Sequence, residues 1–530
     1  MQSKLSVAAC LFCSILLSLP IVAATCDSLA SLKLENTSIT SAQIVTPGTF
    51  VPSGPAPNPA ALALYKSLPA FCRVQGVIQP SSDSHIEFEV WLPASSWNGR
   101  YMGTGNGAYA GTIGYSSGPV ASAIPGLAEA LLGGYAGSAT DTGHKARGDD
   151  AQWALGHPEK IVDYGYRGIH ETAEKSKTII RAFYADGPKH SYFNSCSTGG
   201  RQALMEAQRF PADYDGIVAG APVYYFTHGA AGTISSVQAT EVDPASYIPA
   251  AKLPAIESAA LAACDALDGL KDGLIDDPRK CHFDPATLLC QGPESDRCLT
   301  SPQVAALKKL YSGARTSKGE QIYPGYFPGG ETGANGWGSY ITGSGPGKSM
   351  SYALATQWGY FLQNPAWDYR SFNPDRDVKI FDDALGQRFN AADPNLKAFR
   401  SRGGKLILFQ GWSDAVIAPS GTVDYYENVA AKMGRKDAES FTRLYMVPGM
   451  DHCFFGPGPN SFREPMTAAL EHWVEQGSSP DEIVATKYKT NGDPSSGVAR
   501  TRPLCSYPQV ARYQGSGSID DTANFVCRMP

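Results

Sequence analysis

One serine, placed between a predicted strand and a predicted helix, constrains the fold of this chain more than any other feature. Residues 192–200 read YFNSCSTGG, so an aromatic stretch runs through Ser197 into two glycines, and the strong helix formers of 202–209 follow. Small residues around such a serine permit the sharp strand–turn–helix connection called a nucleophile elbow. Ser195 stands where the usual pattern has glycine, so a glycine-rich helix entry containing an incidental serine is the alternative interpretation.

Strands and helices alternate on both sides of this turn. We expect strands at 85–91, 135–140, 216–222, 405–410 and 441–447, and helices at 169–185 and 468–476. Such alternation predicts a mostly parallel sheet with helices on both faces. Residues 25–70 are rich in Ser, Pro and Ala, and their pattern predicts little packing.

The alternation stops at residue 223 and resumes near residue 394. The intervening segment is rich in Gly, Pro, aromatic residues and closely spaced cysteines, which indicates an inserted domain. With 530 residues the chain is too long for one ordinary domain. We therefore predict an α/β-hydrolase fold in which residues 25–222 and 394–530 form the catalytic domain and residues 223–393 form a lid.

Two further polar residues follow predicted strand ends. Asp414 comes just after the strand at 405–410, and His452 just after the strand at 441–447. The carboxyl ends of parallel strands lie at one edge of a sheet, so both side chains are expected beside Ser197. Acyl transfer by serine needs a base and an acid that orients the base, and Ser–Asp–His is the chain order of α/β-hydrolases. The sequence thus predicts Ser197 as nucleophile, His452 as base and Asp414 as orienting acid.

Plainer interpretations exist for each member of this triad. Asp414 could be a turn aspartate and His452 a loop histidine. Other candidates fit less well: His472 lies within a predicted helix, His144 precedes the serine, and Asp451 adjoins His452 too closely along the chain to orient its ring.

An early glycine-rich run offers the second half of an oxyanion site. Residues 103–107 read GTGNG after a predicted strand. As a flexible loop they would have no special role, but in this position α/β-hydrolases carry backbone N–H donors. We predict that Thr198 N–H and Gly107 N–H bind the oxyanion. A dinucleotide site is excluded because the glycine spacing is wrong.

The N-terminus indicates export. Residues 1–24 have one lysine, a mostly apolar stretch and a small-residue end, as in a signal peptide, and the apolar stretch is short for a membrane anchor. No later segment is a transmembrane candidate. The net charge of −6 argues against a nucleic-acid partner. We expect a secreted or periplasmic protein without nucleic-acid or membrane partners.

Ten cysteines remain after the signal, an even number that implies disulfides in an exported protein. Spacing suggests local pairs, although sequence alone does not fix them, and a different partner for Cys196 stays open. The suggested pairs are Cys264–Cys281, Cys290–Cys298, Cys505–Cys527, Cys26–Cys72 and, by remainder, Cys196–Cys453. None of these ten cysteines forms a Cys-x2-Cys pair, which argues against zinc.

A short acidic loop is a second chemical feature. Asp265, Asp268 and Asp272 lie close together with glycines between them, and such hard oxygen ligands suit calcium. The spacing is not that of an EF-hand, and a solvated acidic turn is the alternative.

The motifs Cys196-Ser197-Thr198-Gly199-Gly200 and Asp451-His452-Cys453 together resemble those of the tannase and feruloyl esterase family. The resemblance covers nearly all of the mature chain. It implies a disulfide between the two motifs, and a structural Ca²⁺ in the lid held by Asp265, Asp268 and Asp272 side chains and the Leu270 and Leu274 carbonyls.

From motifs and resemblance together we expect a serine esterase that hydrolyses small esters of aromatic carboxylic acids. Because mono(hydroxyethyl) terephthalate hydrolases belong to the same family, that activity is the alternative; a catalytically silent binding protein is a second one. Of the lid aromatic residues, Trp358 and Phe361 are the candidates for contacting the acyl group, although most such residues are expected to pack in the lid core.

Overall fold

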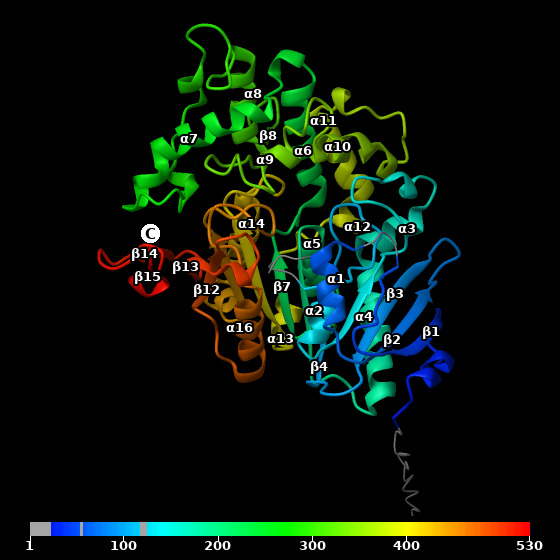
Figure 1. The fold of residues 1–530 in the computed structure, drawn as a ribbon. Helices are drawn as coiled ribbons and strands as arrows, with labels where there is room; N and C mark the ends of the chain where they lie inside the picture. Colours follow the sequence, from blue (N-terminus) through cyan, green and yellow to red (C-terminus); the bar gives the residue numbers. More distant parts are fainter. Residues whose placement is uncertain (1–22, 54–56, 117–124) are drawn as a thin grey trace, which may run out of the picture.

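The computed structural model describes residues 23–53, 57–116 and 125–530, and a nine-stranded sheet forms its centre (Figure 1). In their order across the sheet, the strands are β1 (Thr37–Val45), β2 (Phe71–Ile78), β3 (Ile86–Pro93), β5 (Ala136–Thr140), β4 (Arg100–Thr104), β6 (His190–Cys196), β7 (Gly216–Gly220), β10 (Lys405–Gly411) and β11 (Thr442–Val447). The first four pair antiparallel, and every pair from β5 to β11 is parallel. The predicted parallel half therefore carries an antiparallel extension.

Helices cover both faces of this sheet. They are α1 (Pro59–Lys66), α2 (Leu127–Leu132), α3 (Pro158–Val162), α4 (Gly168–Tyr184), α5 (Thr198–Arg209), α13 (Lys397–Ser401), α14 (Pro419–Met433), α15 (Arg435–Glu439) and α16 (Arg463–Gln476). Along β10, Leu406 and Leu408 enter the core that α5 and α14 share, whereas Ile407 and Phe409 enter the core under α16. Successive side chains of β10 thus point to opposite faces of the sheet, and both faces are buried.

Residues 221–389 add no strand to the central sheet and lie together at the carboxyl ends of its parallel strands, at the top of Figure 1, whereas α13 lies at the opposite end of the sheet. Their helices are α6 (Phe226–Glu241), α7 (Leu253–Cys264), α8 (Ser301–Ser312), α9 (Trp337–Tyr340), α10 (Met350–Phe361), α11 (Pro374–Phe381) and α12 (Gln387–Phe389), and β8 (Ala314–Arg315) pairs with β9 (Gln321–Tyr323). One cluster of buried lid residues is shared with Tyr109 and Tyr164 of the catalytic part. The inserted segment thus packs directly onto the sheet edge that holds Ser197.

Both ends of the described chain form paired strands. Despite its weak pattern, the N-terminal segment supplies β1, which pairs with β2 along its length. At the other end β12 (Glu482–Tyr488) pairs with β13 (Val498–Cys505), and β14 (Val510–Tyr513) with β15 (Phe525–Arg528). The predicted signal segment lies almost wholly outside the described residues. No helix within the described ranges is long and apolar enough to cross a membrane.

Five disulfides link the described cysteines. They are Cys26–Cys72, Cys196–Cys453, Cys264–Cys281, Cys290–Cys298 and Cys505–Cys527, the same pairs that spacing suggested. Four of them join residues at most 46 positions apart, whereas Cys196–Cys453 spans 257 positions. This long link joins the turn after β6 to the loop after β11.

Candidate active site

The backbone at Ser197 has the conformation of a nucleophile elbow. Ser197 follows β6, precedes α5 and has φ 65° and ψ −126°, a region that residues with a side chain rarely adopt. Its N–H donates to the Gly220 carbonyl at the end of β7, which holds the turn in place. The serine hydroxyl therefore projects from the end of β6, directly before the positive end of α5.

The two glycines after Ser197 are required by close packing. A Cβ on Gly199 would lie 1.9 Å from Ser195 Oγ, and a Cβ on Gly200 would lie 2.2 Å from the Gly220 carbonyl oxygen. Because such distances are far below van der Waals contact, only glycine lets α5 begin this near the strands. Ser195, at the unusual first position of the elbow, fills the space that Gly199 leaves.

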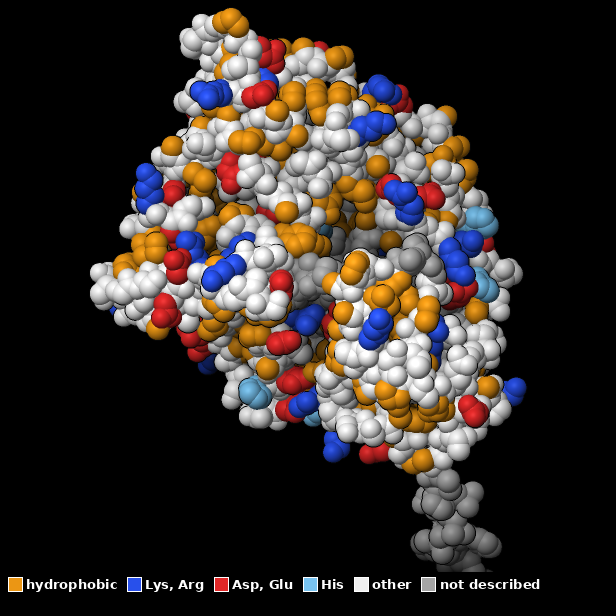
Figure 2. Space-filling view, viewed as in Figure 1, with side chains coloured by type: hydrophobic (Ala, Val, Ile, Leu, Met, Phe, Trp, Pro, Cys, Tyr) orange, Lys and Arg blue, Asp and Glu red, His pale blue; other side chains and the backbone are white. Residues whose placement is uncertain are grey.

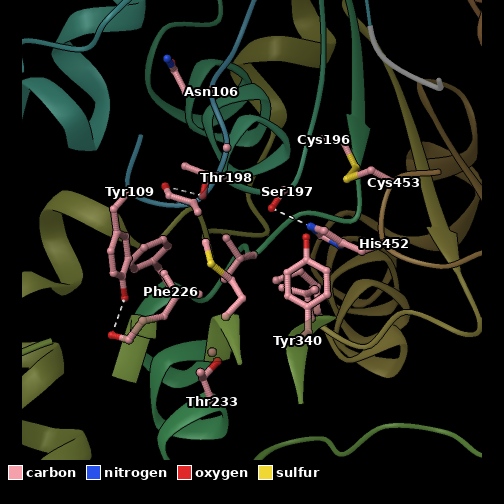
Figure 3. A pocket seen from close by; sticks show the side chains of 18 of the residues that line it. Asn106, Tyr109, Cys196, Ser197, Thr198, Phe226, Thr233, Tyr340, His452 and Cys453 are labelled. Atoms are coloured by element: carbon pink, nitrogen blue, oxygen red, sulfur yellow. Dashed lines mark hydrogen bonds between the residues drawn. A yellow bond between two sulfur atoms is a disulfide. The ribbon is translucent and has the colours of Figure 1, made fainter. Parts of the chain in front are cut away.

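His452 joins Ser197 to Asp414 in the predicted order. Its Nε2 lies 2.8 Å from Ser197 Oγ (Figure 3), and its Nδ1 lies 2.8 Å from Asp414 Oδ2. With the proton on Nδ1, the imidazole donates to Asp414 and accepts from the serine hydroxyl. The structure thus brings together the three residues that the sequence places far apart.

The Asp414 carboxylate is fixed from several directions. It is 1% exposed, and its Oδ1 accepts the N–H groups of Val416 and Ile417 at 2.8 and 2.9 Å. Its Oδ2 accepts from Gln410 Nε2 at 2.8 Å as well as from His452. Such hydrogen bonds hold a buried carboxylate in one orientation, which in turn orients the histidine ring.

Both cysteines of the long disulfide adjoin this triad. Cys196 precedes Ser197, Cys453 follows His452, and their Cα atoms are 6.0 Å apart. The bond therefore ties the serine turn to the histidine loop (Figure 3). It excludes Cys196 as a free thiol nucleophile.

The loop after β4 lies against the start of α5. Thr198 Oγ1 donates to the Ala108 carbonyl at 3.0 Å, and Asn106 N–H donates to Gln202 Oε1 at 3.0 Å. Within the described residues, the backbone N–H groups of Thr198 and Gly107 have no hydrogen-bond partner, and both residues line the cavity beside Ser197. Free N–H groups at a helix start beside a nucleophile are suited to bind an oxyanion.

Sequence reasoning missed two residues that support this arrangement. Gln202 bonds to both the N–H and, at 3.2 Å, the side chain of Asn106. Arg201 is fully buried and donates to the carbonyls of Gly165, Tyr164 and Phe389, so it links α5 to the lid segment. The sequence shows Arg201 and Gln202 as adjacent polar residues at the start of the elbow helix. It does not reveal their partners, which lie far away in the sequence.

A cavity of about 400 Å³ opens beside Ser197 and His452. The lid contributes one face of α6 and one of α10 to its wall, and the catalytic part contributes the β4 loop and the histidine loop. Trp358, one of the two candidate contact residues, lines it. Phe361 does not: it is 2% exposed and packs edge-on against Tyr109 and Trp358, so it belongs to the core behind the wall.

The alternative histidines lie away from the serine. His472 is exposed on α16. His144 is buried, stacks on Trp153 and contacts the Tyr109 carbonyl through Nε2, and burial lowers its pKa to about 4. Neither is bonded to Ser197, in contrast to His452.

Asp451 has a role distinct from that of Asp414. It is fully buried, its Oδ2 accepts the Asn335 N–H at 3.1 Å, and its Oδ1 has no partner among the described residues. Burial, reinforced by the negative charge of Asp414, raises the pKa of Asp451 to about 7. Below pH 7 the carboxyl therefore favours its protonated form.

This shift predicts a pH-dependent stability. An unfolded aspartate has a pKa near 3.8, so between pH 4 and 7 the folded state binds more protons at Asp451 and the free energy of unfolding falls as pH rises. Asp451→Asn should remove this contribution, at most about 1.4 kcal/mol per pH unit. Urea unfolding at several pH values measures it, with the exposed Asp481→Asn as control. Equal slopes in wild type and Asp451→Asn would contradict the prediction.

The predicted calcium residues form a compact loop. The Asp265 carboxylate accepts the N–H groups of Asp272 and Gly273 at 3.1 Å each, and Asp268 Oδ1 accepts the Leu270 N–H at 2.9 Å. Asp272 Oδ1 accepts the Leu274 N–H at 3.2 Å. The disulfide Cys264–Cys281 closes the loop.

The donor chemistry of this loop fits a hard cation. Nearby Asp276 is 8% exposed, and burial together with the Asp268 charge raises its pKa to about 7. Burial also raises the pKa of Asp268. Arg502 Nη2, at 2.8 Å from Asp272 Oδ2, compensates part of the negative charge. A concentration of buried carboxylates of this kind is the setting in which oxygen-ligated Ca²⁺ binds.

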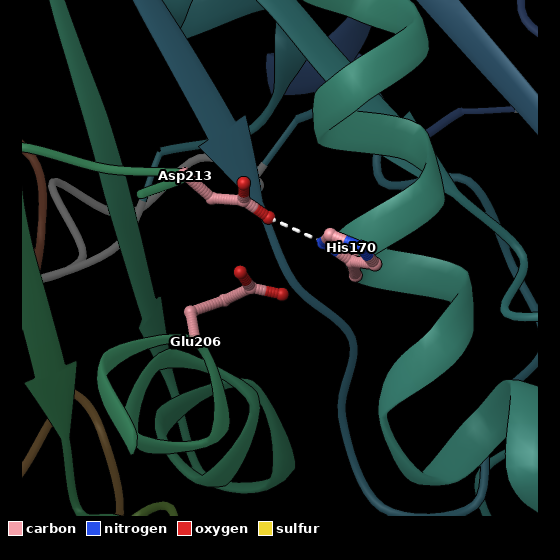
Figure 4. Close-up of side chains that lie close together, drawn as sticks. All are labelled: His170, Glu206 and Asp213. Carbon is pink, nitrogen blue, oxygen red and sulfur yellow. Dashed lines mark hydrogen bonds and ion pairs between the residues drawn. The ribbon is translucent and has the colours of Figure 1, made fainter. Parts of the chain in front are cut away.

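A second group of possible metal ligands lies between α4 and α5. His170, Glu206 and Asp213 are the one set of three within the described ranges whose ligand atoms all lie within 4.8 Å of one another (Figure 4). His170 Nδ1 is 2.6 Å from Asp213 Oδ2, and Lys177 Nζ is 4.0 Å from Asp213 Oδ1. Burial alone would lower the pKa of His170, but the bond to Asp213 raises it. Burial and the negative charge of Asp213 raise the pKa of Glu206, so its carboxyl favours the neutral form. His170 and Lys177 thus compensate the charge of Asp213, and we assign this group a structural role.

Comparisons with known proteins agree with this geometry. The family model described as "Tannase and feruloyl esterase" matches residues 72–528. An uncharacterized esterase of Xanthomonas campestris is 41% identical, with 97% of this chain and 92% of that protein covered. The mono(2-hydroxyethyl) terephthalate hydrolase of Piscinibacter sakaiensis is 36% identical, with 89% and 87% covered. The crystal structure of feruloyl esterase B from Aspergillus oryzae superposes with a TM-score of 0.83 at 29% identity, covering 95% of this chain and 99% of that one. The predicted α/β-hydrolase fold and family resemblance are confirmed.

Proposed function

This chain belongs to the tannase and feruloyl esterase family and is a carboxylic ester hydrolase, and from this premise we propose that it is an exported serine esterase acting on esters of aromatic carboxylic acids. The observation that supports the mechanism best is the continuous chain of hydrogen bonds from Ser197 through His452 to Asp414. Named relatives in the family include feruloyl esterases.

In this mechanism, Ser197 Oγ attacks the ester carbonyl while His452 Nε2 takes its proton. The imidazolium that forms is stabilised by Asp414, which is already bonded to Nδ1. The N–H groups of Thr198 and Gly107 bind the oxyanion at the start of α5. His452 then returns the proton to the leaving alcohol, and water, activated by the same histidine, releases the acid from the acyl-enzyme.

Aromatic acids suit the cavity because its wall is apolar and rich in rings. Tyr109, Phe226 and Tyr340 line it (Figure 3), and Trp358 lines it as well. A volume of about 400 Å³ lies in the range of small-molecule sites. We propose a small aromatic ester as the substrate.

Hydrolysis of mono(hydroxyethyl) terephthalate is the second candidate, favoured by the 36% identity to such an enzyme. Both substrates present an aromatic ester to Ser197 and differ in what the far end of the ring carries. Parallel assays with methyl ferulate, methyl gallate and mono(2-hydroxyethyl) terephthalate test the proposal. Failure to hydrolyse any of these three esters or a simple aryl ester would refute the esterase mechanism.

Export is supported by the disulfides and by the signal-like residues 1–24. Five disulfides are typical of proteins that fold in an oxidising compartment such as the periplasm or the extracellular space. Comparing the mass of mature protein from the periplasm and the medium with that of the full chain tests removal of the segment.

We further propose that Ca²⁺ binds the loop of Asp265, Asp268 and Asp272 with the carbonyls of Leu270 and Leu274, and that its role is structural. The ion would offset the carboxylate charge in the lid, at a place remote in sequence from the triad. Removal of Ca²⁺ with a chelator should therefore lower Tm, and added Ca²⁺ should restore it. Asp268→Asn is the matched variant: its Tm should respond less to Ca²⁺. A wild-type Tm that is the same in metal-free and calcium-loaded protein would contradict the site.

A further inference from the structure

The cavity beside Ser197 carries almost no charge. Of its 29 lining residues, none is Lys, Arg, Asp or Glu, and His452 is the single titratable group besides tyrosines in this part of the described structure. A carboxylate on the acyl group would lose its hydration on entering this cavity and would gain no ion pair there. The free energy of this desolvation disfavours binding.

Thr233 interrupts this apolar wall at a distance from the triad. It lies on the cavity face of α6, two helical turns after Phe226, and Gly229 and Ala230 lie between them on the same face. Figure 3 shows Thr233 apart from Ser197 and His452, with Phe226 on one side and Tyr340 on the other in this view. A ring that enters from Ser197 between these aromatic side chains would direct its far end toward Thr233.

The Thr233 hydroxyl is not used by the fold. Ser236 and Thr240, on the same helix, donate their hydroxyls to the carbonyls four residues earlier, at 3.0 and 3.1 Å. Thr233 makes no such bond and has no hydrogen-bond partner among the described residues. Its side chain is half-buried, so the hydroxyl is a free donor and acceptor within a mostly apolar site.

We propose that Thr233 is a specificity-determining residue whose hydroxyl binds a hydroxyl group on the far end of an aromatic acyl group, in a cavity that rejects acyl groups bearing a carboxylate. This inference rests on the proposed function. The neutral hydrogen bond adds selectivity for acyl groups that carry a hydroxyl over those that lack one. The uncharged wall disfavours substrates whose acyl group carries a carboxylate, such as a terephthalate monoester.

A substrate pair that differs in one hydroxyl tests the first part. In Thr233→Val, the ratio of kcat/KM for methyl 4-hydroxycinnamate to that for methyl cinnamate should fall about fivefold. This is the effect expected from the loss of one hydrogen bond. Thr233→Ser keeps the hydroxyl and should retain most of the ratio. Thr240→Val, the same change on the same helix outside the cavity, should leave it as in wild type. An unchanged ratio in Thr233→Val, or an equal fall in Thr240→Val, would overturn the assignment.

A second pair tests the role of charge. Wild-type enzyme should hydrolyse dimethyl terephthalate with a kcat/KM at least about tenfold above that for monomethyl terephthalate, because the second carries an unpaired carboxylate. Thr233→Lys supplies a cation at the far end and should narrow this gap. Equal rates for the two esters in wild type would refute the selection against charge.

The small ester p-nitrophenyl acetate separates this inference from the proposed function. Its acetyl group does not extend beyond the triad, so turnover that depends on Ser197 establishes the esterase independently of Thr233. If p-nitrophenyl acetate is hydrolysed while both aromatic pairs show no selectivity, the inference fails and the proposed function stands. If no ester is hydrolysed by folded wild-type protein, the proposed function itself fails.

Discussion

Ser197→Ala should lower kcat for aryl esters by at least about 10⁴-fold while leaving the fold intact. In the proposed mechanism the hydroxyl forms the acyl-enzyme, and alanine offers no group that replaces it. Among the residues that the structure describes, the Ser197 hydroxyl bonds only to His452. Steady-state kinetics with p-nitrophenyl acetate and a thermal melt of the same sample measure both effects.

A second serine provides the matched control. Ser176 is fully buried on α4 and its Oγ has no partner among the described residues, so Ser176→Ala removes a hydroxyl from the core without touching the cavity. This variant should keep wild-type kcat. Near-normal activity in Ser197→Ala would show that another residue attacks the ester.

The double change Cys196→Ala with Cys453→Ala should reduce both stability and activity. The bond closes a loop of 257 positions, for which the chain-entropy model gives about 5 kcal/mol if the other disulfides are disregarded. It also holds the serine turn to the histidine loop, and a shift of about 1 Å between reacting groups can cost roughly a hundredfold in rate. We therefore expect activity to be lost at temperatures at which the variant is still folded. Activity and circular dichroism recorded along one temperature ramp test this.

The disulfide Cys290–Cys298 is the control for this prediction. It joins lid residues only 8 positions apart and has no contact with the triad, so the corresponding double alanine variant should melt earlier but lose activity only as it melts. If the Cys196 and Cys453 variant also loses activity only on melting, the disulfide contributes to stability and not to the geometry of the site.

Sequence patterns predicted the features that depend on local order. Ser197, Asp414 and His452 each follow a short buried strand, and parallel strands bring their carboxyl ends to one edge. The serine turn was predictable because glycines and helix formers follow it directly. Spacing sufficed for the local cysteine pairs, since short loops close at small entropic cost.

Features that depend on contacts between distant segments could not be predicted. The exchange of β4 and β5 in the sheet order and the pairing of β1 with β2 have no local signal. The same holds for Arg201, whose partners Tyr164, Gly165 and Phe389 come from separate segments. Trp358 lines the cavity and Phe361, three residues later, does not, because their positions on α10 face different neighbours. Periodicity places both on a buried helix without saying which one the cavity reaches.

Covalent labelling locates the nucleophile most directly. An aryl phosphonate ester, which forms a stable adduct resembling the tetrahedral intermediate, should inactivate the enzyme with one equivalent bound. Proteolysis and mass spectrometry should then place the phosphonyl group on the peptide that contains Ser197, disulfide-linked to the peptide that contains Cys453. Complete inactivation with the label on any other residue, or full activity after stoichiometric labelling of Ser197, would contradict the assignment of Ser197 as the nucleophile.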